Sequence, residues 1–369
     1  MTIRTAFTQH SDVGAAVEDL RAQLAGTSPR LILYFASSRY DVAALAAAME
    51  AGFAPAIVLG CTTAGEQVTG RMLEGAVVAM ALPAEVVSDV CVQVLSGLRD
   101  DEAPVSQAIA GFERHFGRPM RELDPSRYVG LVLIDGLSGS EERVMDGLGN
   151  LADILFVGGG AGDDLGFRAT HVFAGGKALS DAAVLAVLRV ERGYEVLKTQ
   201  SFTAQERKLT VTRARPGTRE VVEFDGKPAA TAYAEAMGVP LADLEKAWNA
   251  HPLGLMVGAE PFVRSPQRVL PDGSIRFYCA MSEGMELSLL SGTDIVRDTR
   301  AALDARLQAG SASALVSFNC ILRRLELDAK DQSAAYGQLF SSVPTVGFAT
   351  YGEEYYGHIN QTATMLLLR

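Results

Sequence analysis

The chain has 369 residues, of which 48% are apolar and 21% are charged, and its formal net charge is −11. This length is ample for two domains, and the composition is typical of a globular protein with a large core. The negative charge and the absence of a dense Lys/Arg cluster argue against a surface for nucleic acid or for an anionic membrane, since both require basic patches.

The N-terminus and the cysteines give no sign of export or of a metal site. The segment MTIRTAFTQH lacks the apolar core of a signal peptide, and no apolar run approaches the roughly 18 residues of a membrane span. Neither a CxxC motif nor a nearby histidine accompanies the cysteines, which are Cys61, Cys91, Cys279 and Cys320. We therefore expect a soluble, cytoplasmic protein with reduced thiols.

Short apolar runs alternate with helical patterns over about the first half of the chain. The apolar spacing predicts helices at residues 12–25, 40–51, 105–116 and 141–151. Between them it predicts strands at residues 31–36, 56–59, 75–82, 86–95, 128–134 and 154–157. Strands that alternate with helices indicate an α/β architecture.

The pattern changes over residues 168–224, which are rich in Val, Thr and Phe and read as consecutive antiparallel strands. Helices are then predicted at residues 229–237 and 241–250. We place a domain boundary at residue 195, which gives domains of residues 1–195 and 196–369. The expected fold is α/β, with mixed sheets, flanking helices and two pseudo-repeated α/β units joined by antiparallel strands.

One motif occurs twice, as GCTTAGE at residues 60–66 and as GFATYGE at residues 347–353. At a constant offset of 287, five residues are identical in the two copies: Gly60, Thr63, Gly65, Glu66 and Gly70 match Gly347, Thr350, Gly352, Glu353 and Gly357. Each copy follows a predicted strand, so we interpret the pair as an internal duplication.

Glycine-rich loops at strand ends are where open α/β sheets bind ligands. Thr63, Glu66, Thr350 and Glu353 are therefore candidate residues of a ligand pocket. The alternative is structural, because glycines also serve tight turns, and Thr and Glu side chains can tie a loop to its own backbone amides. The sequence leaves open whether the two loops form one site or two.

Acidic residues follow two other predicted strands, at Asp135 and at Asp163 and Asp164. They are candidates for a carboxylate cluster, although loop acids after glycine are more often turn formers. The sequence GGGAGDD does not satisfy GxGxxG, because Asp163 stands where the last glycine belongs and no helix follows. Ser140, which precedes Glu141 and Glu142, is better explained as a helix N-cap than as a nucleophile.

Taken together, several motifs resemble the FIST family of sensory proteins, which have a FIST N and a FIST C domain. The N-terminal part contributes GCTTAGE, DGLSGSEE at residues 135–142 and FVGGGAGD at residues 156–163. The C-terminal part contributes FDGKPA from Phe224, Tyr233, PLGL from Pro252, Val263-Arg264, PDGSI from Pro271, CILR at residues 320–323, VGFATYGE ending at Glu353, and Asn360-Gln-Thr362. One departure is CILR, where the family pattern has a small residue, usually glycine, before the arginine.

The resemblance implies ligand sensing coupled to signal transduction. It also implies that the ligands are small molecules such as amino acids. In one subset of the family it implies haem binding, nitric-oxide sensing and control of a partner histidine kinase in two-component signalling. We expect this chain to belong to that subset and to act as a sensor rather than as an enzyme.

If haem is bound, its iron takes a His, Cys, Met or Tyr side chain as an axial ligand. His251 is the first candidate, since it ends the predicted helix 241–250, close to Trp248 and Met256. The alternative is that this histidine only complements the helix dipole. Cys320 and His358 are the next candidates.

Two other functions remain open on the sequence. A haem-free sensor would hold the ammonium group of an amino acid with Asp135 or Asp163, and its carboxylate with Arg264 or Arg323. An enzyme would use Asp135, Glu66 or Glu353 as a general base. The sequence also leaves the oligomeric state open, a homodimer included.

Overall fold

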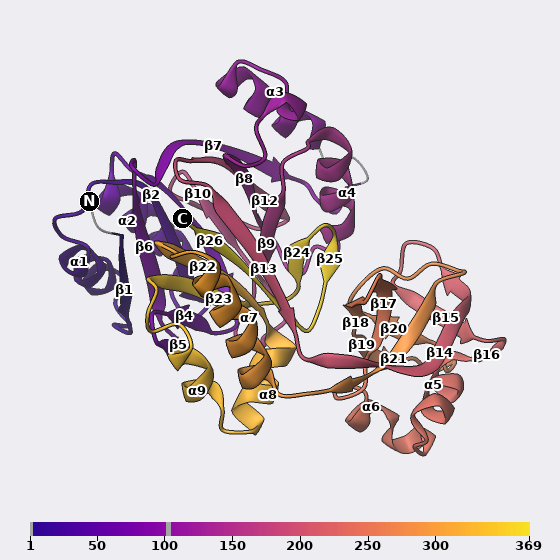
Figure 1. The fold of residues 1–369 in the computed structure, drawn as a ribbon. Coiled ribbons are helices and arrows are strands. Elements are labelled where there is room, and N and C mark those ends of the chain that lie inside the picture. The colour runs from indigo at the N-terminus through magenta and orange to yellow at the C-terminus, as the bar shows by residue number, and fades with distance from the viewer. Residues whose placement is uncertain (1–2, 101–104) are drawn as a thin grey trace. The chain divides into compact units, whose positions relative to one another are not determined.

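The computed structural model describes residues 3–100 and 105–369, which form two compact units (Figure 1). Unit 1 combines the N-terminal segment as far as Thr199 with Arg300–His358 and Ala363–Arg369. Unit 2 consists of Gln200–Thr299 and Ile359–Thr362. The boundary predicted at residue 195 divides the chain into two continuous segments. The compact units are not continuous in sequence, so they do not test this boundary, which stays a prediction.

Unit 1 contains three modules of one topology: a strand, one or two helices, a parallel strand, a two-stranded hairpin and an antiparallel strand. Module 1 consists of β2 (Pro29–Ser37), α2 (Val42–Phe53), β3 (Ile57–Thr63), β4 (Glu66–Val68), β5 (Arg71–Leu73) and β6 (Val77–Pro83). Module 2 consists of β8 (Tyr128–Ile134), α4 (Glu141–Leu151), β9 (Phe156–Gly160), β10 (Val172–Ala174), β11 (Lys177–Leu179) and β12 (Ala182–Val190). Module 3 consists of β22 (Ala314–Cys320), α8 (Ile321–Ala329), α9 (Ser333–Gln338), β23 (Thr345–Thr350), β24 (Glu353–Tyr355), β25 (His358–Ile359) and β26 (Thr362–Leu368).

Each module is preceded by a helix, and three further strands each add one edge to a sheet. The helices are α1 (Val13–Gln23), α3 (Val105–Phe116) and α7 (Ile295–Ala309), and the strands are β1 (Arg4–Thr8), β7 (Val87–Ser96) and β13 (Tyr194–Gln200). The resulting strand orders are β1-β6-β2-β3-β10-β11, β7-β12-β8-β9-β24-β25 and β13-β26-β22-β23-β4-β5. Every sheet thus receives its hairpin from another module, so the three modules interlock in a cyclic, pseudo-threefold arrangement.

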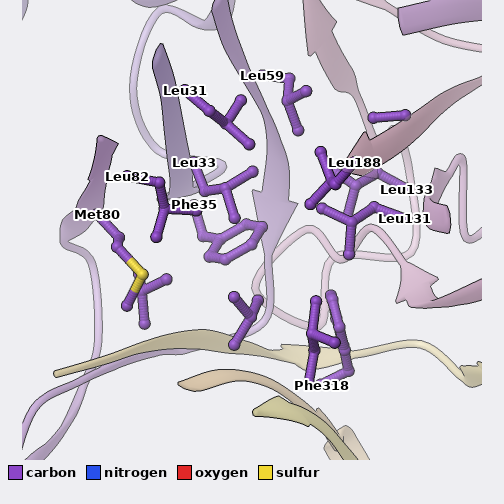
Figure 2. Close-up of a cluster of buried hydrophobic side chains, with 14 of the residues drawn as sticks. Leu31, Leu33, Phe35, Leu59, Met80, Leu82, Leu131, Leu133, Leu188 and Phe318 are labelled. Carbon is purple, nitrogen blue, oxygen red and sulfur yellow. The ribbon is translucent and has the colours of Figure 1, made fainter. Parts of the chain in front are cut away.

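The main core of unit 1 lies where the inner faces of the three sheets meet (Figure 2). Leu31, Leu33 and Phe35 of β2 point into it together with Leu133 of β8 and Phe318 of β22. The alternate residues of β2 face outward and pack under α1 and α2, since successive side chains of a strand point to opposite faces. Both faces of the strand are therefore buried, which explains the continuous apolar run LILYFA.

Unit 2 is built on antiparallel strands with the path β18-β17-β21-β14-β15-β20-β19. These strands are β14 (Phe202–Arg215), β15 (Glu220–Phe224), β17 (Leu253–Val257), β18 (Glu260–Arg264), β19 (Pro266–Val269), β20 (Ile275–Phe277) and β21 (Glu286–Gly292), and the short β16 (Lys227–Pro228) pairs with β15. Between β16 and β17 the chain forms helix α5 (Ala229–Met237), the 3-10 turn Leu241–Asp243 and the one-turn helix α6 (Leu244–Ala247). The core contains Phe224, Tyr233, Trp248 and Phe277.

The structure confirms the predicted fold class, with mixed sheets and flanking helices. The predicted duplication corresponds to modules 1 and 3, and module 2 is a further copy that the motif did not reveal. The single helix predicted at 241–250 is wrong. After Ala247 the chain makes i→i−3 hydrogen bonds, from Ala250 to Ala247 and from His251 to Trp248, and this tighter turn accompanies the burial of Trp248.

No helix within the described ranges combines the length and the apolarity that a membrane span would need. The four cysteines are free thiols, and all four are buried.

Candidate functional site

The two copies of the motif lie side by side at the ends of β3 and β23. The amide of Ala64 donates to the carbonyl of Ala349 at 3.2 Å, and the amide of Ala349 donates to the carbonyl of Gly65 at 2.7 Å. The two GxxTxGE loops are therefore bonded to each other through their backbones.

The loop after β9 completes the ring of loops. The amide of Gly162 donates to the carbonyl of Thr62 at 3.0 Å, which joins module 2 to module 1. The amide of Gly160 donates to the carbonyl of Gly352 at 2.9 Å, and the amide of Tyr351 donates back to Gly160 at 3.0 Å. The second-strand ends of all three modules thus converge on one place in unit 1.

The first glycine of each loop has a packing role. Gly60, Gly158 and Gly347 occupy equivalent positions in parallel registers, opposite Tyr34, Val132 and Ser317 respectively. At each of them a Cβ atom would overlap the carbonyl oxygen of the residue opposite. Only glycine allows this close approach of the two strands. Such a glycine is needed whether or not the loop binds a ligand.

The Thr and Glu residues of the motif bond to each other within each copy. The Thr63 hydroxyl donates to Glu66, whose second oxygen accepts from the amide of Ala76 at 2.9 Å. The Thr350 hydroxyl donates to Glu353 at 2.6 Å. Burial raises the pKa of Glu66 to about 7, although the two hydrogen bonds act in the opposite direction. A carboxyl group that titrates near neutrality within a ring of loops is able to exchange a proton.

Asp135 is buried and holds the backbone around the end of β8. Its carboxylate accepts from the amides of Leu137 at 3.0 Å and Asp181 at 2.6 Å, and from the hydroxyl of Thr170. Arg99 lies 3.9 Å away. These contacts are those of a residue that fixes the backbone of the surrounding loops.

Asp163 organises the longer loop of module 2. Its carboxylate accepts from the amides of Phe167 at 2.7 Å, Arg168 at 2.6 Å and Ala169 at 3.0 Å, and from the Tyr351 hydroxyl at 2.6 Å. Burial alone would raise the pKa of Asp163, but these hydrogen bonds outweigh it and lower the pKa.

This loop carries backbone strain. Asp164, Leu165 and Phe167 have φ values of 52°, 65° and 49°, in the left-handed region that favours glycine. The side chains of Leu165 and Phe167 are 41% and 55% exposed, and the Phe167 ring stacks on that of Tyr351 at 5.0 Å. Tyr351, in the second copy of the motif, therefore holds the loop of another module.

Arg323 lies in a polar layer beneath the helices of module 3. It is 2% exposed, and its Nε donates to the Oδ1 of Asn319 at 3.0 Å. The hydroxyl of Tyr336 lies 3.2 Å from the same oxygen. Gln67 is fully buried nearby in the register opposite Gly347, and neither polar atom of its amide has a hydrogen-bond partner among the described residues.

Glu354 and His358 form a buried ion pair in the hairpin β24–β25. The Nδ1 of His358 lies 2.9 Å from the Oε1 of Glu354. Burial raises the pKa of Glu354 to about 7. Burial by itself lowers the pKa of His358, but the carboxylates of Glu354, Glu141 and Glu142 outweigh it and raise the pKa to about 9. His358, expected only as a reserve iron ligand, is thus held by a carboxylate.

The reserve iron ligands Cys320 and His358 lie in unit 1. The residues expected to contact haem first are the haem candidates His251, Trp248 and Met256, and they lie in unit 2. The Nδ1 of His251 lies 3.2 Å from the carbonyl oxygen of Leu290, and the backbone carbonyl of His251 accepts from the Tyr233 hydroxyl at 2.7 Å. Trp248 is 4% exposed within the core, and Met256 is half-buried on β17.

Arg264, the arginine of the amino-acid hypothesis, is half-buried at the end of β18. Its Nη1 donates to the carbonyl of Val263, and its buried Nε has no partner among the described residues. Unit 1 therefore contains seven of the predicted residues, namely Thr63, Glu66, Asp135, Asp163, Arg323, Thr350 and Glu353, and unit 2 contains Arg264 and the haem candidates.

Comparison with known families decides the family of this chain. The FIST N domain matches residues 30–227, which is more than half of the chain, and the FIST C domain matches residues 229–355. The chain belongs to the FIST family. The FIST C match covers most of unit 2 and also includes β22, α8 and β23 of unit 1.

One curated relative of this FIST protein is an uncharacterized protein from Methanocaldococcus jannaschii. It is 24% identical over 200 residues, which is 50% of this chain and 38% of the relative. The chain thus matches well under half of that longer protein. FIST domains are associated with signal transduction and with the sensing of small ligands.

Two functional candidates of this FIST protein are visible only in the fold. Tyr351 and Glu354 lie within or next to the second motif, but nothing in their spacing indicates a bond to Asp163 or to a buried histidine. Module 2 escaped detection because 11 residues separate β9 from β10, whereas two separate β3 from β4 and β23 from β24. The signal present in the sequence is the run Gly158-Gly-Gly160, which lies beyond the strand predicted at 154–157 but belongs to β9 in the structure.

Proposed function

We propose that this FIST protein is a cytoplasmic sensor that binds haem through His251, responds to nitric oxide and regulates a partner histidine kinase. The proposal is of a binding protein rather than of an enzyme. Membership of the FIST family supports the sensory part, and the surroundings of His251 support the choice of ligand residue.

The hydrogen bond from His251 to Leu290 carries the proposal. Metal-binding histidines commonly donate one ring N–H to a backbone carbonyl, which fixes the tautomer and leaves the other nitrogen as the ligand. His251 has this arrangement, since its Nδ1 lies 3.2 Å from the Leu290 carbonyl oxygen. With the proton on Nδ1, Nε2 carries the free lone pair. The hydrogen bonding of His251 is therefore compatible with a role as an axial ligand of haem iron.

His251 is also placed to pass a change on to its surroundings. Haem, when bound, supplies an iron that takes a diatomic gas as a ligand. The backbone of His251 is bonded to Tyr233 on α5, and its ring to Leu290 on β21. A displacement of His251 would disturb both bonds, so α5 is the element that we expect to respond. Met256 is the candidate for a second contact with haem, and the buried Trp248 would support the turn from within the core.

The test is a titration of the purified protein with haem, monitored by visible absorption. Spectra are then recorded again after reduction and after the addition of nitric oxide. We expect a saturable Soret band at one haem per chain in the wild type. His251→Ala should weaken haem binding by at least about tenfold, as is typical when a metal site loses a key contact. His115→Ala is the matched control. It removes a histidine of unit 1 instead of unit 2 and should bind haem like the wild type.

Equal haem spectra and affinities for the wild type and His251→Ala would contradict the role of this residue. A spectrum of free haem at every ratio would remove the haem proposal. Thermal-shift screening with amino acids would then address the haem-free form of the sensor.

A further inference from the structure

A second site is suggested by an apolar pocket in unit 1, at the C-terminal end of α4. The pocket has a cavity volume of about 380 Å³, which is within the range of small-molecule sites. Its walls come from α4, from the segment that leads into β9, from the start of β13 and from the tip of the hairpin β24–β25. Met145, Leu148 and Phe156 provide its buried apolar surface.

Two tyrosines complete the walls, and one of them is fixed in place. The Tyr194 hydroxyl lies 2.8 Å from the carbonyl oxygen of Pro125 and 3.1 Å from that of Tyr128. Its polar end is thus tied to the backbone, which leaves the ring as a rigid part of the wall. Burial, together with the neighbouring Tyr356 and Asp124, raises the pKa of Tyr194 to about 12, so the ring stays neutral.

Tyr356 is the unusual member of the pocket. Its side chain is 74% exposed, and its backbone has a φ of 53°, which is rare for a bulky residue. Such strain persists only where the surrounding structure enforces it, and it is concentrated at binding sites. At the tip of the hairpin, a small polar residue would avoid both the strain and the exposed ring. The aromatic side chain at this position therefore points to a ligand.

The charged and aromatic residues of the pocket indicate the sign of the charge that its ligand carries. Of the lining residues, only Asp153 carries a formal charge at neutral pH. Asp153 is exposed at the edge of the pocket, and its carboxylate accepts no hydrogen bond from a described residue. Tyrosine rings attract cations through their faces. The carboxylate and the two tyrosine rings favour a positive group and disfavour an anion.

We propose that this pocket binds a small organic cation with an apolar body, with its ammonium group beside Asp153 and its body against Met145, Leu148 and the two tyrosines. The site lies in unit 1 and uses none of the haem candidates, so it goes beyond the function proposed above. The β24–β25 hairpin that carries Tyr356 also carries Glu354 and His358. A ligand that contacts Tyr356 would therefore also affect the hairpin that holds the Glu354–His358 ion pair.

The test uses three probes with the same aromatic ring and different charge: phenethylamine, phenethyl alcohol and hydrocinnamate. Each is titrated into the full-length, haem-free protein and followed by calorimetry. We expect the amine to bind most tightly and the carboxylate most weakly. Added salt should weaken the binding of the amine and leave that of the alcohol unchanged.

Asp153→Asn should lower the affinity for the amine by about three- to tenfold and leave the affinity for the alcohol unchanged. Asp146→Asn is the matched control, because Asp146 is an exposed aspartate on α4 that does not line the pocket. It should leave the affinity for the amine within about twofold of the wild type. Tyr356→Ala should weaken the amine and the alcohol together, with the fold checked by circular dichroism.

Equal affinities for the three probes, or no binding of any of them, would overturn the proposal. An equal loss in Asp153→Asn and Asp146→Asn would overturn the role of Asp153. The haem titration is a separate measurement, which Asp153→Asn should not affect, so failure of this site and failure of the haem proposal are distinguishable.

Discussion

His358 is a buried histidine whose charge is set by three neighbouring carboxylates. It is 4% exposed, and the acidic groups that face it are Glu354 on its own hairpin and Glu141 and Glu142 at the start of α4. A protonated imidazole in this position offsets the burial of several carboxylates. Loss of its proton would leave Glu354 with an unpaired charge in the core, which is costly.

The first prediction concerns pH. The pKa of His358 rises from 6.5 to about 9 on folding, and that of Glu354 rises from 4.5 to about 7. A group whose pKa is raised by folding stabilises the fold at low pH, and this stabilisation is lost as the pH rises through the folded value. The thermal unfolding midpoint should therefore fall between about pH 5 and pH 9. The measurement is thermal unfolding across that range.

The double variant Glu354→Gln/His358→Gln should flatten this pH dependence over the whole range. Glu66→Gln should flatten only its lower part, because the pKa of Glu66 is raised to about 7. His115→Gln should leave the profile unchanged. If the double variant kept the wild-type slope, the ion pair would not be the group that titrates.

A second prediction uses two glycines of one hairpin. Gly352 and Gly357 have φ values of +153° and +147°, so alanine is strained at both. A Cβ at Gly352 would overlap the His358 imidazole, whereas a Cβ at Gly357 would meet nothing within 4 Å. Gly357→Ala should cost about 1 kcal/mol of unfolding free energy, and Gly352→Ala about 1–3 kcal/mol more. Equal losses in urea-induced unfolding would show that the contact with His358 does not matter.

At the scale of elements, the loop 163–168 depends on a residue that is distant in sequence. Tyr351 donates its hydroxyl hydrogen to Asp163 at 2.6 Å and accepts from the amide of Leu165 at 3.0 Å, and its ring stacks on Phe167. The strained backbone of this loop is held by these contacts and by the four hydrogen bonds that Asp163 accepts. Removal of the Tyr351 hydroxyl should therefore loosen the loop.

The third prediction is that Tyr351→Phe loosens this loop. It removes a hydrogen bond to a charged group, which is typically worth about 1.5–3 kcal/mol. Hydrogen exchange should accelerate at the amides of Phe167, Arg168 and Ala169, as followed by mass spectrometry of peptides from this region. Tyr336→Phe removes a buried hydroxyl elsewhere in unit 1 and is the control. Faster exchange in both variants would indicate general destabilisation instead.

At the scale of the whole molecule, the division into units separates the haem candidates from the ring of loops. The main core of unit 2 is formed entirely by residues between Leu209 and Leu289. Residues 359–362 add a few hydrogen bonds to this unit, including those from Gln361 to Asn249 and from Ser265 to Gln361. The core therefore does not depend on the rest of the chain.

The fourth prediction is that a fragment of residues 200–299 folds on its own. We expect a dispersed amide NMR spectrum and cooperative unfolding, with lower stability than in the full chain because the bonds to Asn360 and Gln361 are missing. The variant Trp248→Ala in the same fragment should lose about 3–5 kcal/mol, since it empties a core position. A fragment without a cooperative transition would show that unit 2 depends on unit 1.

The sequence by itself determined the fold class, most of the helices and strands, and the family, because apolar periodicity and motif spacing are local properties of the chain. It also located both GxxTxGE loops at strand ends. Tertiary structure alone decided that the helix expected at 241–250 breaks into turns, since the burial of Trp248 outweighs local helical preference. It also decided that Glu354 meets His358, that Tyr351 meets Asp163, and that a third module closes the ring. Glu354 meets His358 only when the chain turns between β24 and β25, and the Tyr351–Asp163 bond joins two modules. No local pattern specifies which sheet receives a hairpin.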